Sequence, residues 1–171
     1  MNMNRQTTTS GFTLIETMVA ISILLISLAG PMAIASRSLI SAYYARDQIT
    51  AFYLAQEGIE YIRAKRDQNY LATPANSWLT GIDNCIDASC NVDFPNFSHA
   101  VCSSACAPLL ISDEGGLYNT ASGKPSGFTR TVTLTRVSGT SDEVIAKVTI
   151  SWVSAGINRS FQLTENLFNW I

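Results

Sequence analysis

Seven residues near the N-terminus, Ser10 to Glu16, place a small-residue junction and one carboxylate at the head of an apolar run. Gly11 separates a polar leader from hydrophobic Phe12, and no charged side chain occurs between Thr17 and Ala35. A carboxylate at the edge of a bilayer is costly and normally has a partner. The spacing therefore indicates that Glu16 needs a compensating positive charge.

Four cysteines within 22 positions form the second group with chemical potential: Cys85, Cys90, Cys102 and Cys106. Their even number, and a position outside the cytoplasm, predict two disulfides, and all three connectivities remain open. The alternative is a zinc site that includes His99, the single histidine. The spacings C-x4-C and C-x3-C are looser than the C-x2-C of zinc ribbons, so we expect no metal and interpret His99 as a loop residue.

Other chemistry has little support in the chain. With one histidine, no G-x-S-x-G, no phosphate-binding glycine loop and no cysteine expected to stay a thiolate, we expect no catalytic residues and no cofactor. The net charge of −2 provides no electrostatic footprint for nucleic acid, so direct nucleic-acid binding is not expected.

The element that carries Glu16 is an apolar segment at residues 12–35. Its 24 residues would form a helix of about 36 Å, long enough to cross a hydrocarbon core. The alternative is a signal peptide cleaved after Ala35, at the A-x-A sequence before Ser36. Arg5 is the only basic residue of the leader, and the run is longer than a usual h-region, so a membrane-spanning helix is favoured.

An amphipathic helix is predicted to continue the apolar one over residues 36–69. Its stripe of apolar residues recurs at three- and four-residue steps: Leu39, Ala42, Ala45, Ile49, Phe52, Ala55, Ile59 and Ile62. Gly58 lies inside this helix at a cost of about 1 kcal/mol relative to alanine. Gly30 and Pro31 interrupt the apolar half, where we expect a kink or a locally unwound stretch.

These features together resemble the N-terminus of type IV prepilins and pseudopilins over residues 1–68. The resemblance implies that a prepilin peptidase cleaves between Gly11 and Phe12, and that the new amino group of Phe12 is N-methylated. Glu16 then becomes the fifth residue of the mature chain and pairs with the Phe12 amine of a neighbouring subunit. The leader contains fewer lysines and arginines than is usual in the family, and Pro31 lies nearer the mature N-terminus than the proline of major pilins.

By this resemblance, the chain is expected to be a minor pilin or a pseudopilin that acts in adhesion, motility, DNA uptake or secretion. Its partners would be other pilin subunits, the prepilin peptidase and an inner-membrane assembly platform. It would be held in the bacterial cytoplasmic membrane by one span, with a cytoplasmic N-terminus, before joining an extracellular or periplasmic filament. The alternative is a membrane-anchored or secreted binding module that does not polymerise.

Beyond the helices, two further regions are predicted. Residues 70–127 are rich in turn formers and contain all four cysteines, and we expect an irregular, disulfide-stapled surface region. Residues 128–171 alternate apolar and polar side chains in three stretches, which predicts an antiparallel meander. Trp152 and Trp170 are expected in packing. The residues expected to point inward are Phe128, Val132, Leu134, Val144, Ala146, Val148, Ile150, Trp152, Phe161, Leu163 and Leu167.

The predicted organisation is therefore a leader at 1–11, an apolar helix at 12–35, an amphipathic helix at 36–69, a stapled region at 70–127 and a sheet at 128–171. The fold class is α+β, with the long helix packed on a C-terminal antiparallel sheet, which is also the architecture that the resemblance implies.

Overall fold

A computed structural model describes residues 11–72 and 77–169 of the 171-residue chain. Helix α1 runs from Leu14 to Ala72, and the chain divides within it into two compact units, Met1–Ala42 and Tyr43–Ile171. The two units are described separately. The leader up to Ser10, with Arg5, and the C-terminal Trp170 lie outside the described residues.

The described part of the first unit consists of three residues and then the N-terminal part of α1. The helix is continuous through Gly30 and Pro31, so the chain is not unwound there, and a bend at these two residues stays a prediction. Every residue from Gly11 to Ala42 is exposed. This part of α1 therefore presents apolar side chains on all sides and buries none of them within its own unit.

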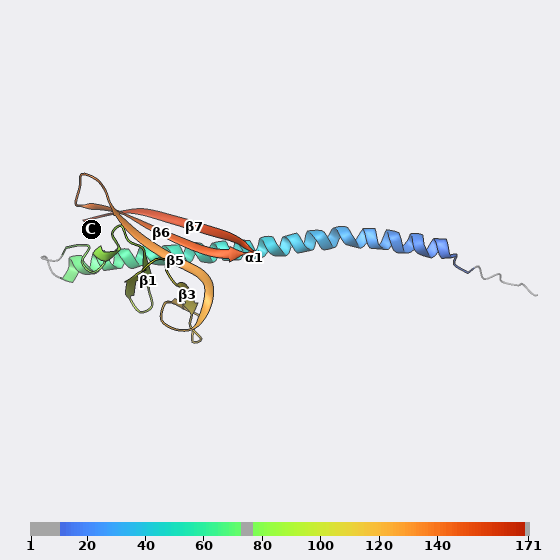
Figure 1. Cartoon of the computed structure of the whole chain (residues 1–171), viewed down its shortest axis with the longest axis horizontal. Coiled ribbons are helices and arrows are strands. Elements are labelled where there is room, and N and C mark those ends of the chain that lie inside the picture. Colours follow the sequence, from blue (N-terminus) through green and yellow to red (C-terminus); the bar gives the residue numbers. More distant parts are fainter. Residues whose placement is uncertain (1–10, 73–76, 170–171) are drawn as a thin grey trace, which may run out of the picture. The chain divides into compact units, whose positions relative to one another are not determined.

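The second unit combines the rest of α1 with one antiparallel sheet of seven strands (Figure 1). The strands are β1 (Cys90–Asp93), β2 (Ser98–Val101), β3 (Pro108–Ile111), β4 (Tyr118–Asn119), β5 (Lys124–Arg136), β6 (Glu143–Ser154) and β7 (Ile157–Phe168), and η1 (Asp83–Cys85) is one turn of 3-10 helix. Strand β5 pairs with β6 along one edge and with β1 and β3 along the other. The α+β fold class and the antiparallel sheet are confirmed.

Strands β5, β6 and β7 form the predicted meander. Val132 lies opposite Val148, which lies opposite Leu163, so alternate residues of all three strands share one face. The β6–β7 hairpin closes through Ala155 and Gly156, both at positive φ. Two central residues at positive φ make the type I′ turn, whose twist matches that of the flanking strands.

Four of the seven strands lie between residues 77 and 123, where the sequence shows no sustained period. Each has only two to four residues, which is too short for an alternation to be visible in the sequence. The segment also contributes to the core, because Leu79, Ile82 and Val92 are fully or almost fully buried. The region is therefore part of the sheet and not only a surface loop.

The core of the second unit lies between α1 and the inner face of the sheet. The helix buries residues at three- and four-residue steps: Ala51, Leu54, Ala55, Gly58, Ile59, Tyr61 and Ile62. Ala55, Ile59 and Ile62 of the predicted stripe are buried. Ile49 stays 58% exposed and Phe52 40% exposed, so the buried face follows the stripe only in its later part. Phe52 instead packs edge-on against Phe161 at the margin of the sheet, with ring centroids 5.8 Å apart.

Gly58 lies at a close contact between helix and sheet. A Cβ atom at this position would lie 3.0 Å from Cγ1 of Val148 and 3.3 Å from Cδ of Arg130. The residue that lowers helix propensity is therefore the one that allows the two layers to meet. Tertiary packing here outweighs the preference for alanine.

Gly58→Leu is expected to lower the free energy of unfolding of the head by about 2 kcal/mol or more, because the larger side chain overpacks the contact with Val148. Thermal unfolding followed by near-UV circular dichroism measures this. Gln56→Leu, at an exposed position on the same helix, is the control and should change stability by about 0.5 kcal/mol at most. Equal effects of the two substitutions would contradict the packing role.

Candidate functional site

The first turn of α1 is built on Thr13. The Thr13 hydroxyl accepts a hydrogen bond from the backbone N–H of Glu16 at 3.3 Å, and its carbonyl accepts one from the N–H of Thr17 at 3.2 Å. Thr13 is therefore the N-cap, and the T-x-x-E spacing is that of a capping box. The capping role of Thr13 was not among the sequence-based predictions, although the T-x-x-E spacing is its signal.

Glu16 lies in this first turn with its side chain on an exposed stretch of helix. A carboxylate there complements the helix dipole by about 0.3–1 kcal/mol. Among residues 11–72 and 77–169, no cationic side chain lies within ion-pair distance of Glu16. The described part of the chain thus positions this carboxylate without neutralising it.

Gly11 and Phe12 precede the cap as an accessible segment. A Cβ atom at Gly11 would meet no heavy atom within 4 Å, and Phe12 is 80% exposed. The fold therefore does not require glycine at position 11. A requirement for glycine at this position would therefore have to come from another protein that recognises the Gly11–Phe12 segment.

The hydroxyl groups in the apolar half of α1 are satisfied by the helix itself. Each donates to a carbonyl three or four residues earlier: Thr17 to Leu14, Ser22 to Met18, Ser27 to Leu24 and Ser36 to Met32, at 2.7–3.0 Å. Such bonds remove the cost of placing a hydroxyl where no water is available. Helix α1 is also the one described helix whose length and composition would allow it to cross a membrane.

Pro31 has no N–H group, so it cannot bond to the Ser27 carbonyl four residues earlier. The hydroxyl of Ser27 donates to the carbonyl of Leu24 at 2.8 Å. The local change in hydrogen bonding is therefore confined to one missing backbone donor within a continuous helix.

In the second unit, Arg130 is the most deeply buried charged residue described, with no exposed surface. It lies on the inner face of β5, and its guanidinium donates to the backbone carbonyls of Leu54 (3.2 Å) and Val92 (2.6 Å) and to Oε1 of Glu57 (3.1 Å). Burial lowers its pKa, while the charge of Glu57 opposes the shift. One side chain thus joins α1, β1 and β5. Arg130 lies in the alternating pattern of β5 but was not among the predicted inward residues.

Asp93 is a second buried charge, only 1% exposed, at the end of β1. Its Oδ1 accepts the N–H of Asn96 (3.0 Å), and its Oδ2 accepts the side-chain amide of Asn96 (3.0 Å) and both the N–H and the hydroxyl of Thr120 (2.8 Å each). Burial alone would raise the pKa of Asp93, but these four hydrogen bonds outweigh it and hold the pKa below its ordinary value. The carboxylate therefore ties the β1–β2 turn to the segment after β4.

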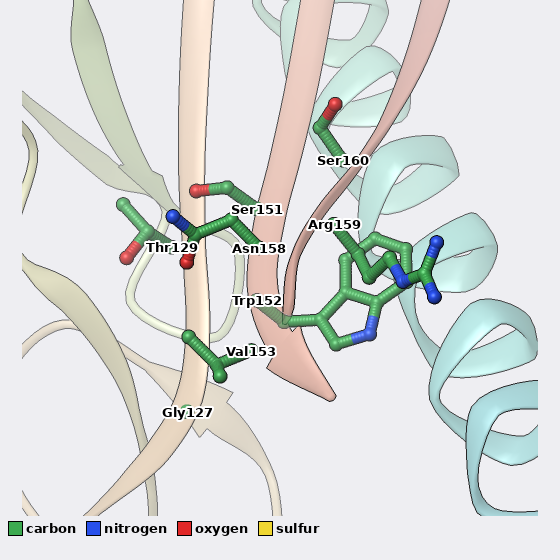
Figure 2. Close-up of a pocket in the computed structure, with 8 residues that line it drawn as sticks. All are labelled: Gly127, Thr129, Ser151, Trp152, Val153, Asn158, Arg159 and Ser160. Atoms are coloured by element: carbon green, nitrogen blue, oxygen red, sulfur yellow. The ribbon is translucent and has the colours of Figure 1, made fainter. Parts of the chain in front are cut away.

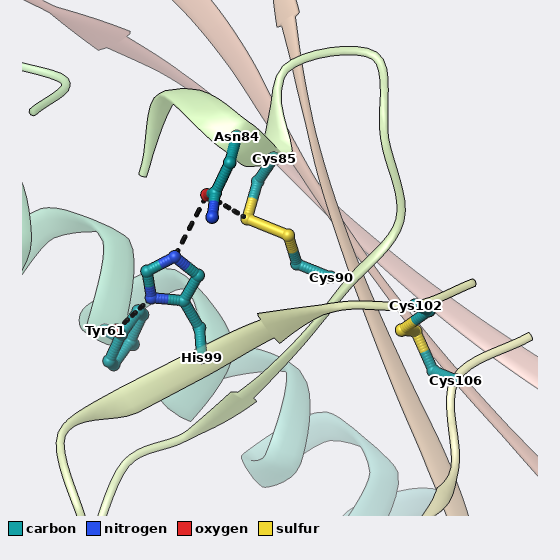
Figure 3. Close-up of a disulfide and its surroundings, with 7 residues drawn as sticks. All are labelled: Tyr61, Asn84, Cys85, Cys90, His99, Cys102 and Cys106. Carbon is teal, nitrogen blue, oxygen red and sulfur yellow. Dashed lines mark hydrogen bonds between the residues drawn. A yellow bond between two sulfur atoms is a disulfide. The ribbon is translucent and has the colours of Figure 1, made fainter. Parts of the chain in front are cut away.

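His99 lies on β2 and not in a loop, between Tyr61 of α1 and Asn84 of η1 (Figure 3). Its Nε2 lies 3.0 Å from Oδ1 of Asn84, which can only accept, so Nε2 carries the proton. Its Nδ1 then accepts from the Tyr61 hydroxyl at 2.8 Å. Burial and the charge of Lys65 lower the pKa of His99, in keeping with a neutral ring that has a packing role.

The cysteines form two local disulfides, Cys85–Cys90 and Cys102–Cys106 (Figure 3). The first is buried in the core and joins η1 to β1, and the second closes the loop between β2 and β3. Of the three connectivities that the sequence left open, the structure shows the sequential one. This pairing uses all four thiols that the zinc alternative requires.

Comparison with known proteins bears on the N-terminal segment. Residues 7–30 match the family model described as the prokaryotic N-terminal methylation motif, which is the prepilin motif of type IV pilins. No curated protein and no solved structure matches the chain. The resemblance stated from Gly11 to Glu16 is therefore confirmed for this segment, while the head is characterised by its own structure.

Asp93→Asn is expected to lower the free energy of unfolding of the head by about 2 kcal/mol at pH 7, because hydrogen bonds to a charged acceptor are lost. The folded-state pKa of Asp93 is lowered, so its contribution is complete above the ordinary value of 3.8 and is lost as the pH falls through the folded-state pKa. Denaturant unfolding of both proteins between pH 7 and pH 2 should show two converging curves.

Asp113→Asn is the matched control. Asp113 is 71% exposed and pairs with Lys124 at 3.4 Å, so its replacement should have little effect at any pH. A difference between wild type and Asp93→Asn that stays constant down to pH 2 would contradict the charged network.

Proposed function

We propose that this chain, which carries the prokaryotic N-terminal methylation motif at residues 7–30, is a structural subunit of a type IV pilus-like filament, either a minor pilin or a pseudopilin. The motif implies processing by a prepilin peptidase and polymerisation with other pilins. Adhesion, motility, DNA uptake and secretion are the functions that such a filament would serve. The proposal assigns no catalytic step to the chain.

The observation that carries the proposal is that every described residue from Gly11 to Ala42 is exposed, on a helix with apolar side chains on all sides. Before assembly, lipid would cover this surface, with the N-terminus on the cytoplasmic side and the head across the membrane. After assembly, the same surface would be covered by the helices of other subunits in an extracellular or periplasmic filament. An inner-membrane assembly platform would mediate the transfer.

Processing would create the charge that Glu16 needs. Hydrolysis of the Gly11–Phe12 peptide bond by water releases the leader and leaves an amino group on Phe12, which stays cationic after N-methylation. In an apolar environment, this amine and the carboxylate of Glu16 are each costly alone. Pairing Glu16 of one subunit with the Phe12 amine of its neighbour removes both costs and rewards one axial stagger over others.

One further feature of the structure supports an axial assembly. The Ser and Thr hydroxyls of the apolar half are bonded within the helix, so adjacent helices can approach without unpaired donors. A bend at Gly30 and Pro31 would let the membrane segment adjust its direction relative to its neighbours while remaining helical.

Glu16→Gln tests the charge pairing apart from helix capping, since glutamine also fits the capping box. The variant should be cleaved at Gly11 as usual but should enter filaments about tenfold less, because the Phe12 amine of the neighbour is left unpaired. Quantitative immunoblotting of sheared filaments against membrane fractions measures this.

Thr13→Val is the matched variant, since it removes the cap that Thr13 provides and keeps the Glu16 charge. It should retain filament incorporation. Equal incorporation of Glu16→Gln and wild type would contradict the pairing, and equal losses in the two variants would assign the effect to helix capping. A chain that is processed normally but recovered only from membranes or medium would favour a non-polymerising binding module.

A further inference from the structure

The face of β5–β7 that points away from α1 is rich in hydroxyl groups. Thr129, Thr131, Thr133 and Thr135 alternate with the inward residues of β5, so their side chains lie in one line along the strand. Ser151 and Ser160 continue the row that begins at Thr129. Threonine is common in strands because its side chain is β-branched. Strand propensity does not explain the serine hydroxyls, which extend the pattern over all three strands.

This face carries very little charge. The next row after Ser151 and Ser160 pairs Thr149 with Gln162, and the following row pairs Lys147 with Thr164. In the rows from Thr129 to Thr133, Lys147 is the one charged side chain. Protein surfaces designed for solubility are given about 25–35% charged residues. This face carries fewer charges than that, and solubility alone does not explain why its donors and acceptors are neutral.

At one end of the face lies a hollow of about 440 Å³. Gly127 has no side chain to fill it, and the groups around it include Thr129, Ser151, Asn158 and Ser160. Figure 2 shows the side chains of Thr129, Ser151 and Asn158 gathered together on the same side of the sheet. Its volume is within the range of about 300–1,000 Å³ that is typical of sites for small ligands.

The cation nearest to this hollow is directed away from it. Arg159 belongs to the lining, but its guanidinium lies over the ring of Tyr44 on α1, 4.9 Å from the ring centroid. Figure 2 shows Arg159 and the Trp152 ring on the helix side of the strands, opposite Thr129 and Asn158. The polar side chains that gather in the hollow are therefore hydroxyls and one amide with no formal charge, and they lie beside the apolar side chain of Val153.

We propose that this hollow, with the adjoining threonine rows, binds a neutral oligosaccharide. Hydroxyls and amides both donate and accept, so they match the hydroxyl groups of sugars. The absence of charge among the gathered groups disfavours acidic ligands, which would lose hydration without gaining an ion pair. The rows along β5 continue in line with the hollow and can bind further sugar units of a linear chain. This binding does not depend on whether the chain polymerises.

The test is binding of cellohexaose, maltohexaose and chitohexaose to the full chain in detergent micelles, measured by saturation-transfer NMR and titration calorimetry. At least one neutral hexasaccharide should bind. The triple variant Thr129→Val, Ser151→Ala and Asn158→Ala removes three hydrogen-bonding groups and should weaken that binding about tenfold or more.

Ser103→Ala is the matched control, because it removes an exposed hydroxyl from the loop between β2 and β3, outside the hollow and the threonine rows. It should bind like wild type, and unchanged thermal unfolding of all variants excludes loss of the fold. The proposal is overturned if none of the three neutral hexasaccharides binds, if the triple variant binds as well as wild type, or if sialylated or sulfated oligosaccharides bind in preference to neutral ones.

Discussion

The structure depends on one constraint: the apolar surface of the first part of α1 is not covered within its own unit. Every described residue from Gly11 to Ala42 is exposed, including side chains such as Leu14, Ile15 and Ile26. Exposed apolar area on this scale is unfavourable in water. Under the proposed function, lipid covers this surface before assembly and the helices of other subunits cover it afterwards, with no change of fold. Glu16 restricts how this apolar surface can be placed, because a carboxylate has only a few favourable positions in such surroundings.

The second part of α1, in contrast, buries its apolar side chains against the sheet. Gly58 allows close approach, and Arg130 connects the helix to two strands through hydrogen bonds to backbone carbonyls. A buried guanidinium is costly without partners, so it rewards one arrangement of these elements over others. Asp93 and the Cys85–Cys90 disulfide do the same for the short strands, which have too few residues to be stable alone. The head is thus built from a regular meander and from segments held by specific polar and covalent contacts.

The sequence predicted the elements whose apolar pattern repeats over a long stretch. The helix, the β5–β7 meander and the inward residues Val144 to Trp152 follow from repetition over ten residues or more. Strands β1–β4 could not be predicted, since two to four residues carry no visible alternation. The sequential disulfides depend on tertiary distances that spacing does not determine.

At the N-terminus, Gly11, Phe12 and Glu16 were identified by their motif, whereas the capping role of Thr13 became evident from its hydrogen bond. The predicted stripe of α1 is buried at its later residues but not at Ile49 and Phe52, because the position of the sheet, and not helical periodicity alone, decides which residues are covered.

The central claim is that the junction at Gly11 prepares the helix for assembly. The most direct measurement is the intact mass and N-terminal sequence of the mature chain purified from membranes and filaments of its natural host. The account predicts a chain that begins at Phe12 with a methyl group on its amine, and with Glu16 as its fifth residue. A mature chain that begins at Ser36, or one that retains Met1 and the leader in assembled filaments, would contradict it.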